Sequence, residues 1–278
     1  MSMKMKIETA WQAILATAGR SQGAAGVDLE AAMRDRTAIE PAALQMLECL
    51  LPLARSLGPL VIGQIGQSLD GRICTETGDS HYVNGDAALV HLHRLRALVD
   101  CVLVGVGTMV ADRPQLTVRH VPGPDPVRAV LDPRGRAPAG VSPLAPAADA
   151  APTLHLVDAA RIDRLDPPAA HVQRVPLHRT GDGAADHDAA GGVAPCDVLA
   201  ALAGVGCRRV LVEGGSTTLS HFFDAGALDR LHVLVAPLLI GSGRPGLSLA
   251  PVQRLRDVPR PPMRRYLLGE DTLFDIEL

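Results

Sequence analysis

The sequence predicts an α/β fold whose central sheet is mixed but mostly parallel, flanked by helices and preceded by a small helical extension. From residue 58 to residue 278, short apolar runs alternate with stretches of helical periodicity, which is typical of parallel sheets covered on both faces. Little helix separates the last strands, and this indicates an antiparallel edge. Residues 1–57 are instead rich in alanine, with leucine, isoleucine and methionine at helical spacing. We therefore divide the chain into an extension, 1–57, and a main domain, 58–278.

The extension is predicted to hold three helices, at 8–18, 28–36 and 40–56, with a glycine-rich break at 19–26. Pro41 fits the first turn of the third helix, because its missing N–H has no partner to lose there. We find no residue set with recognisable chemistry in this segment. We expect it to serve packing or contacts between subunits.

In the main domain, apolar and β-branched runs of strand length predict the sheet. The expected strands are Leu60–Ile65, Cys101–Val106, Val127–Leu131, Thr153–Val157, His171–Val175, Arg209–Glu213, Leu231–Pro237 and Tyr266–Glu277. The expected helices are Asp86–Leu98, Val198–Ala203 and Thr217–Ala225. Two stretches rich in proline, glycine and alanine, 134–152 and 176–195, are expected to be surface loops.

Composition excludes several classes of function. The net charge of −3 and the 2% of aromatic residues argue against binding to nucleic acid or to an anionic membrane. The longest apolar runs are far shorter than the roughly 20 residues of a membrane span. The five cysteines lack C-x-x-C spacing, so we expect buried free thiols in the cytoplasm. Because no H-E-x-x-H motif or clustered His/Cys set is present, we expect no metal site.

A strand that ends at Glu213 runs through Gly214 and Gly215 into a helix that opens with Ser216 and Thr217. The first N–H groups of a helix are free and lie at the positive end of its dipole, where phosphate binds readily. Glycines let the backbone approach a ligand closely. An ordinary capped helix after a tight turn is the alternative.

A second glycine-rich segment, Val-Gly-Val-Gly-Thr at 104–108, also follows a strand. It lacks the third glycine of the dinucleotide fingerprint, since Val110 stands at that position, so it does not predict a Rossmann fold. Thr108 could cap a short helix or hydrogen-bond a ligand. Arg96 and Arg119 are candidate anion anchors, because a guanidinium matches a phosphate with two hydrogen bonds.

Carboxylates and histidines complete the set of candidates. Asp70 could orient a sugar hydroxyl or only form a turn. His91 and His93 are expected to point apart on their helix, and His232 is expected to be structural or exposed. Asp112 and Glu213 lie at the ends of apolar segments, where a carboxylate can orient a ligand.

Residues from about 59 to 278 resemble the reductase domain of riboflavin biosynthesis, the 5-amino-6-(5-phosphoribosylamino)uracil reductases. The resemblance rests on motifs in matching order and spacing. They are Ser-Leu-Asp-Gly (68–71), Gly-Asp-Ser (78–80), His-Arg-Leu-Arg (93–96), Val-Gly-x-Gly-Thr (104–108), Ala-Asp-x-Pro-x-Leu-Thr-Val-Arg (111–119), Val-Glu-Gly-Gly (212–215) and Ala-Pro-x-Leu-Ile-Gly (236–241). The resemblance implies a dihydrofolate-reductase-like fold, NADPH as the hydride donor and a homodimer.

The resemblance also implies a set of site residues. Cofactor contacts would fall at Gly66, Tyr82, Thr108, Asp112, Gly215, Ser216, Thr217, Thr218, Leu219 and Ser220. Substrate contacts would fall at Ser80, Arg96, Asp112, Leu116, Arg119 and Glu213. Arg96 and Arg119 would hold the ribose phosphate, and Asp112 and Glu213 are the candidate catalytic groups. The implied reaction opens the ribosylamino sugar and reduces its C1′ to give a ribitylamine.

Three functions follow for testing. The first is reduction of a phosphoribosylamino-pyrimidine without a deaminase domain, because 1–57 is too short for one and lacks its zinc motif. The second is reduction of a pteridine such as a dihydropterin, since Gln64 and Gln67 depart from the family pattern, as do Tyr82 and Arg113. The third is a non-catalytic ligand-binding or regulatory module that uses the helical extension as its interaction surface.

Overall fold

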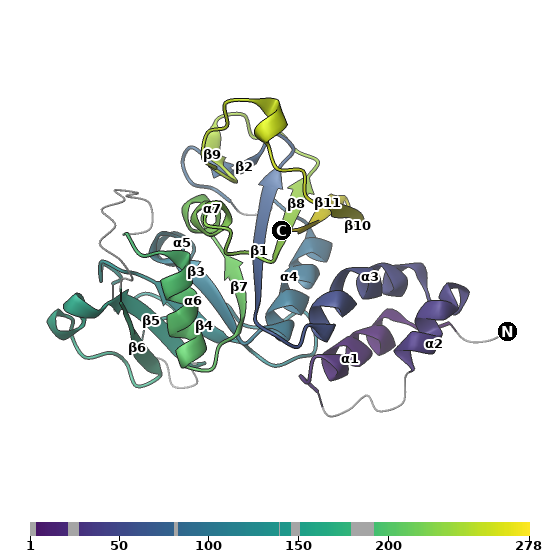
Figure 1. Ribbon diagram of the computed structural model, residues 1–278, viewed down its shortest axis with the longest axis horizontal. Helices are drawn as coiled ribbons and strands as arrows, with labels where there is room; N and C mark the ends of the chain where they lie inside the picture. Colours follow the sequence, from purple (N-terminus) through teal and green to yellow (C-terminus); the bar gives the residue numbers. More distant parts are fainter. Residues whose placement is uncertain (1–3, 22–27, 81–82, 139, 146–150, 179–191) are drawn as a thin grey trace.

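A nine-stranded sheet forms the centre of the computed structural model, which describes residues 4–21, 28–80, 83–138, 140–145, 151–178 and 192–278 (Figure 1). In spatial order the strands are β10 (Met263–Leu268), β11 (Asp271–Glu277), β8 (Arg230–Ala236), β1 (Leu60–Ser68), β7 (Arg209–Glu213), β3 (Cys101–Gly105), β4 (Val127–Leu131), β5 (Thr153–Asp158) and β6 (Val172–Leu177). The strands from β8 to β6 are all parallel, whereas β11 is antiparallel to β8 and to β10. The predicted mixed sheet and its antiparallel edge are therefore confirmed.

Helices cover both faces of this sheet, because side chains along each strand alternate between two apolar clusters. On β1, Ile62 faces a cluster that includes the helices α1 (Ile7–Thr17), α3 (Pro41–Arg55) and α4 (Asp86–Leu98). Its neighbours Val61 and Ile65 face the helices α6 (Pro195–Gly204) and α7 (Ser216–Asp224). Both clusters are almost wholly aliphatic, as the composition requires.

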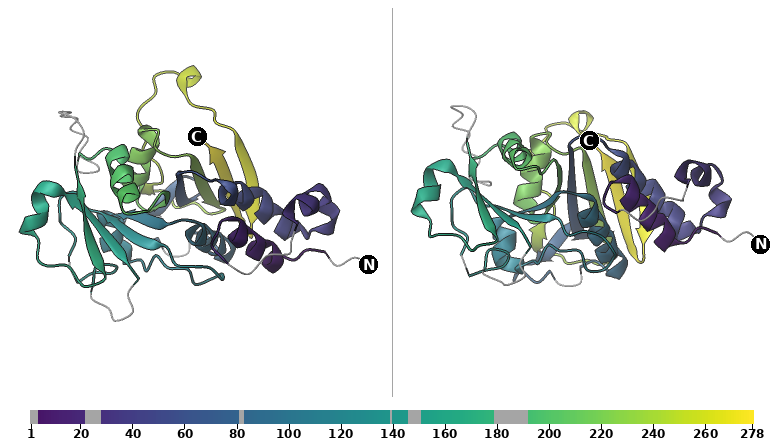
Figure 2. Two further views of the ribbon diagram at one scale, coloured as in Figure 1. Left: turned by 60° about the horizontal axis from the view of Figure 1, so that its bottom comes forward. Right: turned by 90° about the horizontal axis from the view of Figure 1, so that it is seen from below.

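The predicted helices of the extension are confirmed as α1, α2 (Leu29–Arg34) and α3. The Asp28 carboxylate caps α2 by accepting from the N–H of Ala31, and Pro41 is the first residue of α3. Figure 2 shows these helices at one end of the molecule, beside α4 and the β10–β11 hairpin. Their buried side chains continue without a break into the cluster on that face of the sheet.

The structure differs from the predicted elements at three places. Strand β3 ends at Gly105 because a helix, α5 (Val106–Asp112), begins at the next residue. The single strand predicted at 266–277 is a hairpin, whose turn uses Gly269 at a φ of +66°. Two short strands, β2 (Arg72–Thr75) and β9 (Gly243–Pro245), form a separate ladder.

The remaining elements are three short 3-10 helices: η1 (Arg36–Ala38), η2 (Ala159–Arg164) and η3 (Leu255–Asp257). Much of the predicted loop at 176–195 and part of that at 134–152 lie outside the described residues. Over the described part of the chain, no helix is long and apolar enough to cross a membrane.

Strand order positions the candidate site. The chain adds β4, β5 and β6 outward from β3, then returns with β7 between β1 and β3. In open α/β sheets, ligands bind beyond the carboxyl ends of the strands where the order reverses in this way. The glycine-rich segments that follow β3 and β7 are therefore placed next to one another at that edge.

Candidate functional site

A hydrogen bond joins the two glycine-rich segments at the carboxyl ends of β3 and β7. The backbone N–H of Gly215 donates to the Thr108 hydroxyl oxygen over 2.7 Å. Thr108 lies within α5 and Gly215 is the N-cap residue of α7, so each strand is followed at once by a helix whose start faces the other segment. Thr108 thus holds the turn after β7 from outside, and does not cap its own helix.

The turn after β7 has no room for side chains on its glycines. A Cβ atom on Gly214 or on Gly215 would lie 3.1 or 3.0 Å from the Thr108 hydroxyl oxygen. Gly214 also has a φ of +122°, which favours glycine strongly. The result is a bare backbone cradle at the start of α7, of the kind that accommodates a phosphate group.

The first turn of α7 offers hydrogen-bond donors. The N–H groups of Thr218 and Leu219 donate to the carbonyl of Gly215. Among the described residues, none accepts from the N–H of Ser216 or Thr217. These two donors and the positive end of the helix dipole suit the phosphate of a nucleotide.

The predicted cofactor stretch 215–220 divides into two kinds of residue. Ser216 is half-buried and Thr217 is exposed, so their polar groups lie near the surface of the cradle. Leu219 is fully buried in the core under the sheet, and the Ser220 hydroxyl accepts from the backbone N–H of Ser248. The side chains of Ser216 and Thr217 can therefore reach a ligand more easily than those of Leu219 and Ser220.

Arg96 and Glu213 form a buried ion pair that the sequence did not predict. The Arg96 Nε and Nη2 atoms donate to the two carboxylate oxygens of Glu213, each over 2.7 Å. A third donor, Nη1, reaches the carbonyl of Thr117 over 3.0 Å. Both side chains are less than 10% exposed. The Arg96 guanidinium therefore faces Glu213, and its assignment as a phosphate anchor stays a prediction.

The segment from 113 to 119 follows α5 in a strained conformation. Arg113 and Leu116 have φ values of 46° and 58°, in the left-handed region that side chains seldom adopt. Leu116 is almost completely buried, which helps to hold this backbone in place. Such strain costs of order 1–3 kcal/mol per residue and gathers at functional sites.

Arg119, at the end of this segment, is exposed and held by two kinds of contact. Its Nη1 donates to the side-chain oxygens of Gln115 and Thr117, each over 2.8 Å. Its backbone N–H donates to Nδ1 of His93 over 2.9 Å. Among the predicted anion anchors, Arg119 is thus the one whose guanidinium lies at the surface.

The pKa of His93 is lowered from 6.5 to about 4. Burial is the main cause, and the positive charges of Arg96, His120 and Arg119 add to it. Nδ1 of His93 can accept from Arg119 only while the ring is neutral. The same ring packs against His120, so His93 links the helix α4 to the 113–119 segment.

Other predicted contacts come from β1 and the loop that follows it. A Cβ on Gly66 would lie only 1.9 Å from Oδ1 of Asn84, so a larger residue here would displace the Asn84 side chain. The buried Nδ2 of Asn84 has no hydrogen-bond partner among the described residues. Asn84 was not among the predicted site residues, and its unpartnered donor beside Gly66 makes it a further candidate. Ser80 is half-buried, and Tyr82 lies outside the described residues.

Asp70 has a structural role. Its carboxylate accepts from the hydroxyl of Ser68 and from the backbone N–H groups of Ile240 and Gly241. These bonds lower the pKa of Asp70 from 3.8 to about 2. They tie the end of β1 to the loop after β8, so of the two roles considered for Asp70 the turn is confirmed. Asp112, at the end of α5, is exposed.

Comparison with known proteins identifies the family. Residues 59–259 match the model of the RibD C-terminal domain. The chain belongs to the RibD C-terminal domain family. It is 33% identical over 232 residues to the 2,5-diamino-6-ribosylamino-4(3H)-pyrimidinone 5′-phosphate reductase of Methanothermobacter thermautotrophicus, an alignment that covers 78% of this chain and 97% of that protein.

Relatives named RibD are longer than the matched region. The riboflavin biosynthesis protein RibD of Bacillus amyloliquefaciens is 34% identical over 216 residues, which cover 72% of this chain and 52% of that protein. The solved structure of Acinetobacter baumannii RibD, form 1, has a TM-score of 0.61 at 24% identity and covers 84% of this chain and 62% of that one. Together with the observed sheet, this likeness confirms the predicted mixed, mostly parallel sheet flanked by helices, in the fold that RibD has.

Proposed function

We propose that this protein reduces a phosphoribosylamino-pyrimidine to its ribitylamino form, with NADPH as the hydride donor. The single observation that carries the proposal is the contact between Thr108 and Gly215. It joins two strand ends into one bare backbone cradle. Glu213, the acceptor of the buried Arg96–Glu213 pair, directly precedes this cradle in the chain. Membership of a family of riboflavin-biosynthesis reductases supports the same conclusion.

The cradle fits the phosphate groups of a dinucleotide. Gly214 and Gly215 leave space that a Cβ would fill, and Ser216 and Thr217 present N–H groups from which no described residue accepts. Gly66 and the buried Asn84 amide would meet the nicotinamide end, where an orphaned N–H donor can bind a carboxamide oxygen. Bound NADPH would supply a hydride for C1′ of the opened sugar. Thr108 and Asp112 would line the path between these two ends.

On the substrate side, Glu213 would accept N–H groups of the pyrimidine ring. Arg96 donates to both of its oxygens, so the carboxylate is fixed in direction. Arg119 would bind the phosphate from the surface, and Ser80 and Leu116 would complete the contacts. Fixing the ring and the phosphate places C1′ beside the cofactor, and positioning of this kind accounts for a large part of enzymatic rate enhancement.

Reduction of C1′ also requires a proton for the nitrogen that becomes the ribitylamine. Glu213 is engaged with Arg96 as an acceptor, and this leaves Asp112 as the carboxyl group on the solvent side that can relay a proton. We therefore assign orientation to Glu213 and proton transfer to Asp112.

The experiment is NADPH oxidation with two pyrimidines that differ at one ring position. One is 5-amino-6-(5-phosphoribosylamino)uracil, and the other is the diamino-pyrimidinone named for the Methanothermobacter relative. A dihydropterin panel runs beside them, because Gln64 lies next to Glu213 across β1 and β7. Turnover of a phosphorylated pyrimidine with no turnover of pterins is the expected result. Turnover of pterins alone would overturn the substrate, and no turnover together with no NADPH binding in calorimetry would favour a non-catalytic module.

We also propose a cytoplasmic homodimer, as is usual for this reductase family. Sedimentation equilibrium of the purified chain measures the association state directly. A monomer at concentrations where the enzyme turns over substrate would overturn this part of the proposal.

A further inference from the structure

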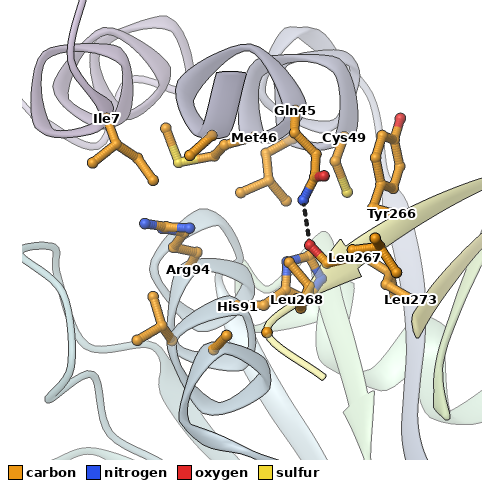
Figure 3. Close-up of a pocket in the computed structure, with 15 residues that line it drawn as sticks. Ile7, Gln45, Met46, Cys49, His91, Arg94, Tyr266, Leu267, Leu268 and Leu273 are labelled. Atoms are coloured by element: carbon orange, nitrogen blue, oxygen red, sulfur yellow. Dashed lines mark hydrogen bonds between the residues drawn. The ribbon is translucent and has the colours of Figure 1, made fainter. Parts of the chain in front are cut away.

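A cavity of about 320 Å³ lies between α1, α3, α4 and the β10–β11 hairpin (Figure 3). Its wall is mostly aliphatic, and its polar members are Gln45, Cys49, His91, Arg94 and Tyr266. Gln45 closes one side by donating to the carbonyl of Leu267 over 2.7 Å. None of the residues assigned to the reductase site lines this cavity.

Three potential metal ligands meet at the wall of this cavity. The ligand atoms of Cys49, His91 and His232 all lie within 4.8 Å of one another. His91 Nε2 and His232 Nδ1 are 3.0 Å apart, and all three side chains are buried. Cys49 comes from α3, His91 from α4 and His232 from β8, so side chains of three different elements meet at one point. We call these three residues the Cys49 cluster.

A carboxylate stands behind the cluster. Asp275 Oδ1 lies 3.1 Å from Nε2 of His232, on the side of the ring opposite to His91. Asp275 is fixed in turn by Arg230, which also pairs with Glu277. Metal-binding histidines usually have such a group beside their second ring nitrogen. Here Nε2 of His232 lies at ion-pair distance from Asp275 but makes no hydrogen bond with a described residue.

We propose that the Cys49 cluster binds one zinc ion through Cys49 Sγ, His91 Nε2 and His232 Nδ1. A thiolate with two imidazoles is a donor set that zinc prefers. With Zn–N bonds of about 2.0–2.1 Å at tetrahedral angles, two ligand nitrogens lie roughly 3.3 Å apart. The observed 3.0 Å therefore needs only a small opening of the two rings, and the sulfur a modest approach.

Charge and access also suit a zinc ion at this place. The thiolate of Cys49 and the carboxylate of Asp275 would offset the two positive charges of zinc, and Arg230 already pairs with Asp275. Cys49 and His91 both line the cavity, which gives the ion an entry path and leaves a fourth position for water.

Bound zinc would fasten the N-terminal helices to the sheet, because α3 supplies the thiolate. A hydrogen bond between two neutral imidazoles also explains the 3.0 Å contact. It does not explain why the Cys49 thiol and the Asp275 carboxylate lie beside the same two rings. The expectation of no metal site came from motif spacing alone. This cluster has no motif, since its ligands are far apart in the chain.

The test measures metal content and its position in the full chain, purified without an affinity tag that binds metal. After incubation with zinc and desalting, we expect one equivalent of zinc per chain by inductively coupled plasma mass spectrometry. Cys49→Ser is expected to lower zinc affinity at least tenfold. The matched control is Cys196→Ser, which removes an exposed free cysteine and is expected to change nothing.

Two measurements on the wild-type chain cover the case in which Cys49→Ser does not fold. Cobalt substitution is expected to give a thiolate charge-transfer band and the intense visible bands of tetrahedral cobalt. Anomalous scattering at the zinc edge is expected to give a peak between Cys49, His91 and His232. Zinc below a tenth of an equivalent, or a peak elsewhere, would overturn the proposal.

Discussion

The reductase site and the Cys49 cluster place polar side chains in opposite settings. The site lies at the open edge of the sheet, where Ser216, Thr217 and Arg119 are half-buried or exposed. The Cys49 cluster lies between layers, where its three side chains are at most 5% exposed. At the edge, water can satisfy a polar group that lacks a protein partner. In the interior, polar groups must satisfy one another or bind a ligand.

The Arg96–Glu213 pair has features of both settings. It belongs to the site by position, at the end of β7, yet it is as well buried as the interior cluster. A residue of the site can therefore be costly to remove for reasons unrelated to catalysis. Substitutions that separate the two causes are therefore the most informative, and they are ordered below by expected effect.

Removal of one partner of the buried pair is expected to have the largest effect. Arg96→Met leaves the Glu213 carboxylate buried without its partner, and we expect a loss of about 3–5 kcal/mol in the free energy of unfolding. Urea denaturation followed by circular dichroism measures this loss. A merely exposed anion anchor would cost far less when removed.

The control for this prediction removes both charges. The double variant Arg96→Met, Glu213→Leu is expected to recover most of the free energy of unfolding. Two apolar side chains then replace two charges whose burial carries a desolvation penalty. Turnover is expected to stay absent, since Glu213 would orient the pyrimidine in the proposed reaction. A double variant as unstable as Arg96→Met alone would show that the unpaired charge is not the cause.

A substitution in the backbone cradle is expected to have the next largest effect. Gly214→Ala puts a side chain at a φ of +122° and a Cβ 3.1 Å from Thr108. Strain of this kind costs about 1–3 kcal/mol, and a loss of about 1.4 kcal/mol in binding weakens affinity tenfold. We expect NADPH affinity, measured by calorimetry, to fall tenfold or more.

Gly204→Ala is the matched control for the cradle. Gly204 ends α6, and a Cβ built there meets nothing within 4 Å. This variant is expected to bind NADPH as the wild type does. Equal affinity in both variants would mean that the cradle does not hold the cofactor.

Much of the fold and the open site could be predicted because their signals are local. The Glu213-Gly214-Gly215 turn and the Thr108 segment each lie within a few residues of a strand end, and the strand runs predict that these ends share an edge. Helix α5 was missed because its 7 residues hold too few turns to show a periodicity. The hairpin at 263–277 was merged into one strand, since its turn has only one glycine.

The remaining features could not be predicted because they depend on contacts between distant segments. Arg96 and Glu213 are 117 residues apart in the chain, and nothing in either motif indicates that one fills the other's hydrogen bonds. His91 and His232 are 141 apart. The sequence did indicate that His91 and His93 point apart, and the structure confirms this, with His93 facing Arg119.

Loss of the hydroxyl that joins the two segments is expected to have a moderate effect. Thr108→Val keeps the shape of the side chain but leaves the N–H of Gly215 without its acceptor. The net value of such a hydrogen bond is about 1 kcal/mol, so NADPH affinity is expected to fall several-fold. Thr108→Ser is expected to restore it.

Thr17→Val is the control for the Thr108 variants. Its hydroxyl donates to the carbonyl of Ala13 within α1, away from the site. Stability can therefore be compared for the loss of one hydroxyl in each region, while only Thr108→Val is expected to change cofactor binding. Weaker binding in both variants would point to a general loss of stability.

The smallest effect at neutral pH is expected from His93, whose influence grows as the pH falls. The pKa of this ring is about 4 in the folded protein and about 6.5 when it is unfolded. Between these values the unfolded chain binds more protons, so stability declines as the pH falls from about 6.5 to 4. In the folded enzyme the ring is protonated only as the pH approaches its pKa of about 4, and protonation removes the acceptor for the Arg119 N–H, so the KM for the phosphorylated substrate is expected to rise near pH 4.

His93→Asn separates this effect from general acid sensitivity. In this variant the side-chain amide oxygen can stand where Nδ1 accepts from Arg119, but the amide does not titrate, so the slope of stability against pH between 6.5 and 4 is expected to flatten. His178→Asn removes an exposed histidine and is expected to keep the wild-type slope. Equal slopes in the wild type and both variants would mean that protonation of His93 is not the cause of the loss of stability between pH 6.5 and 4.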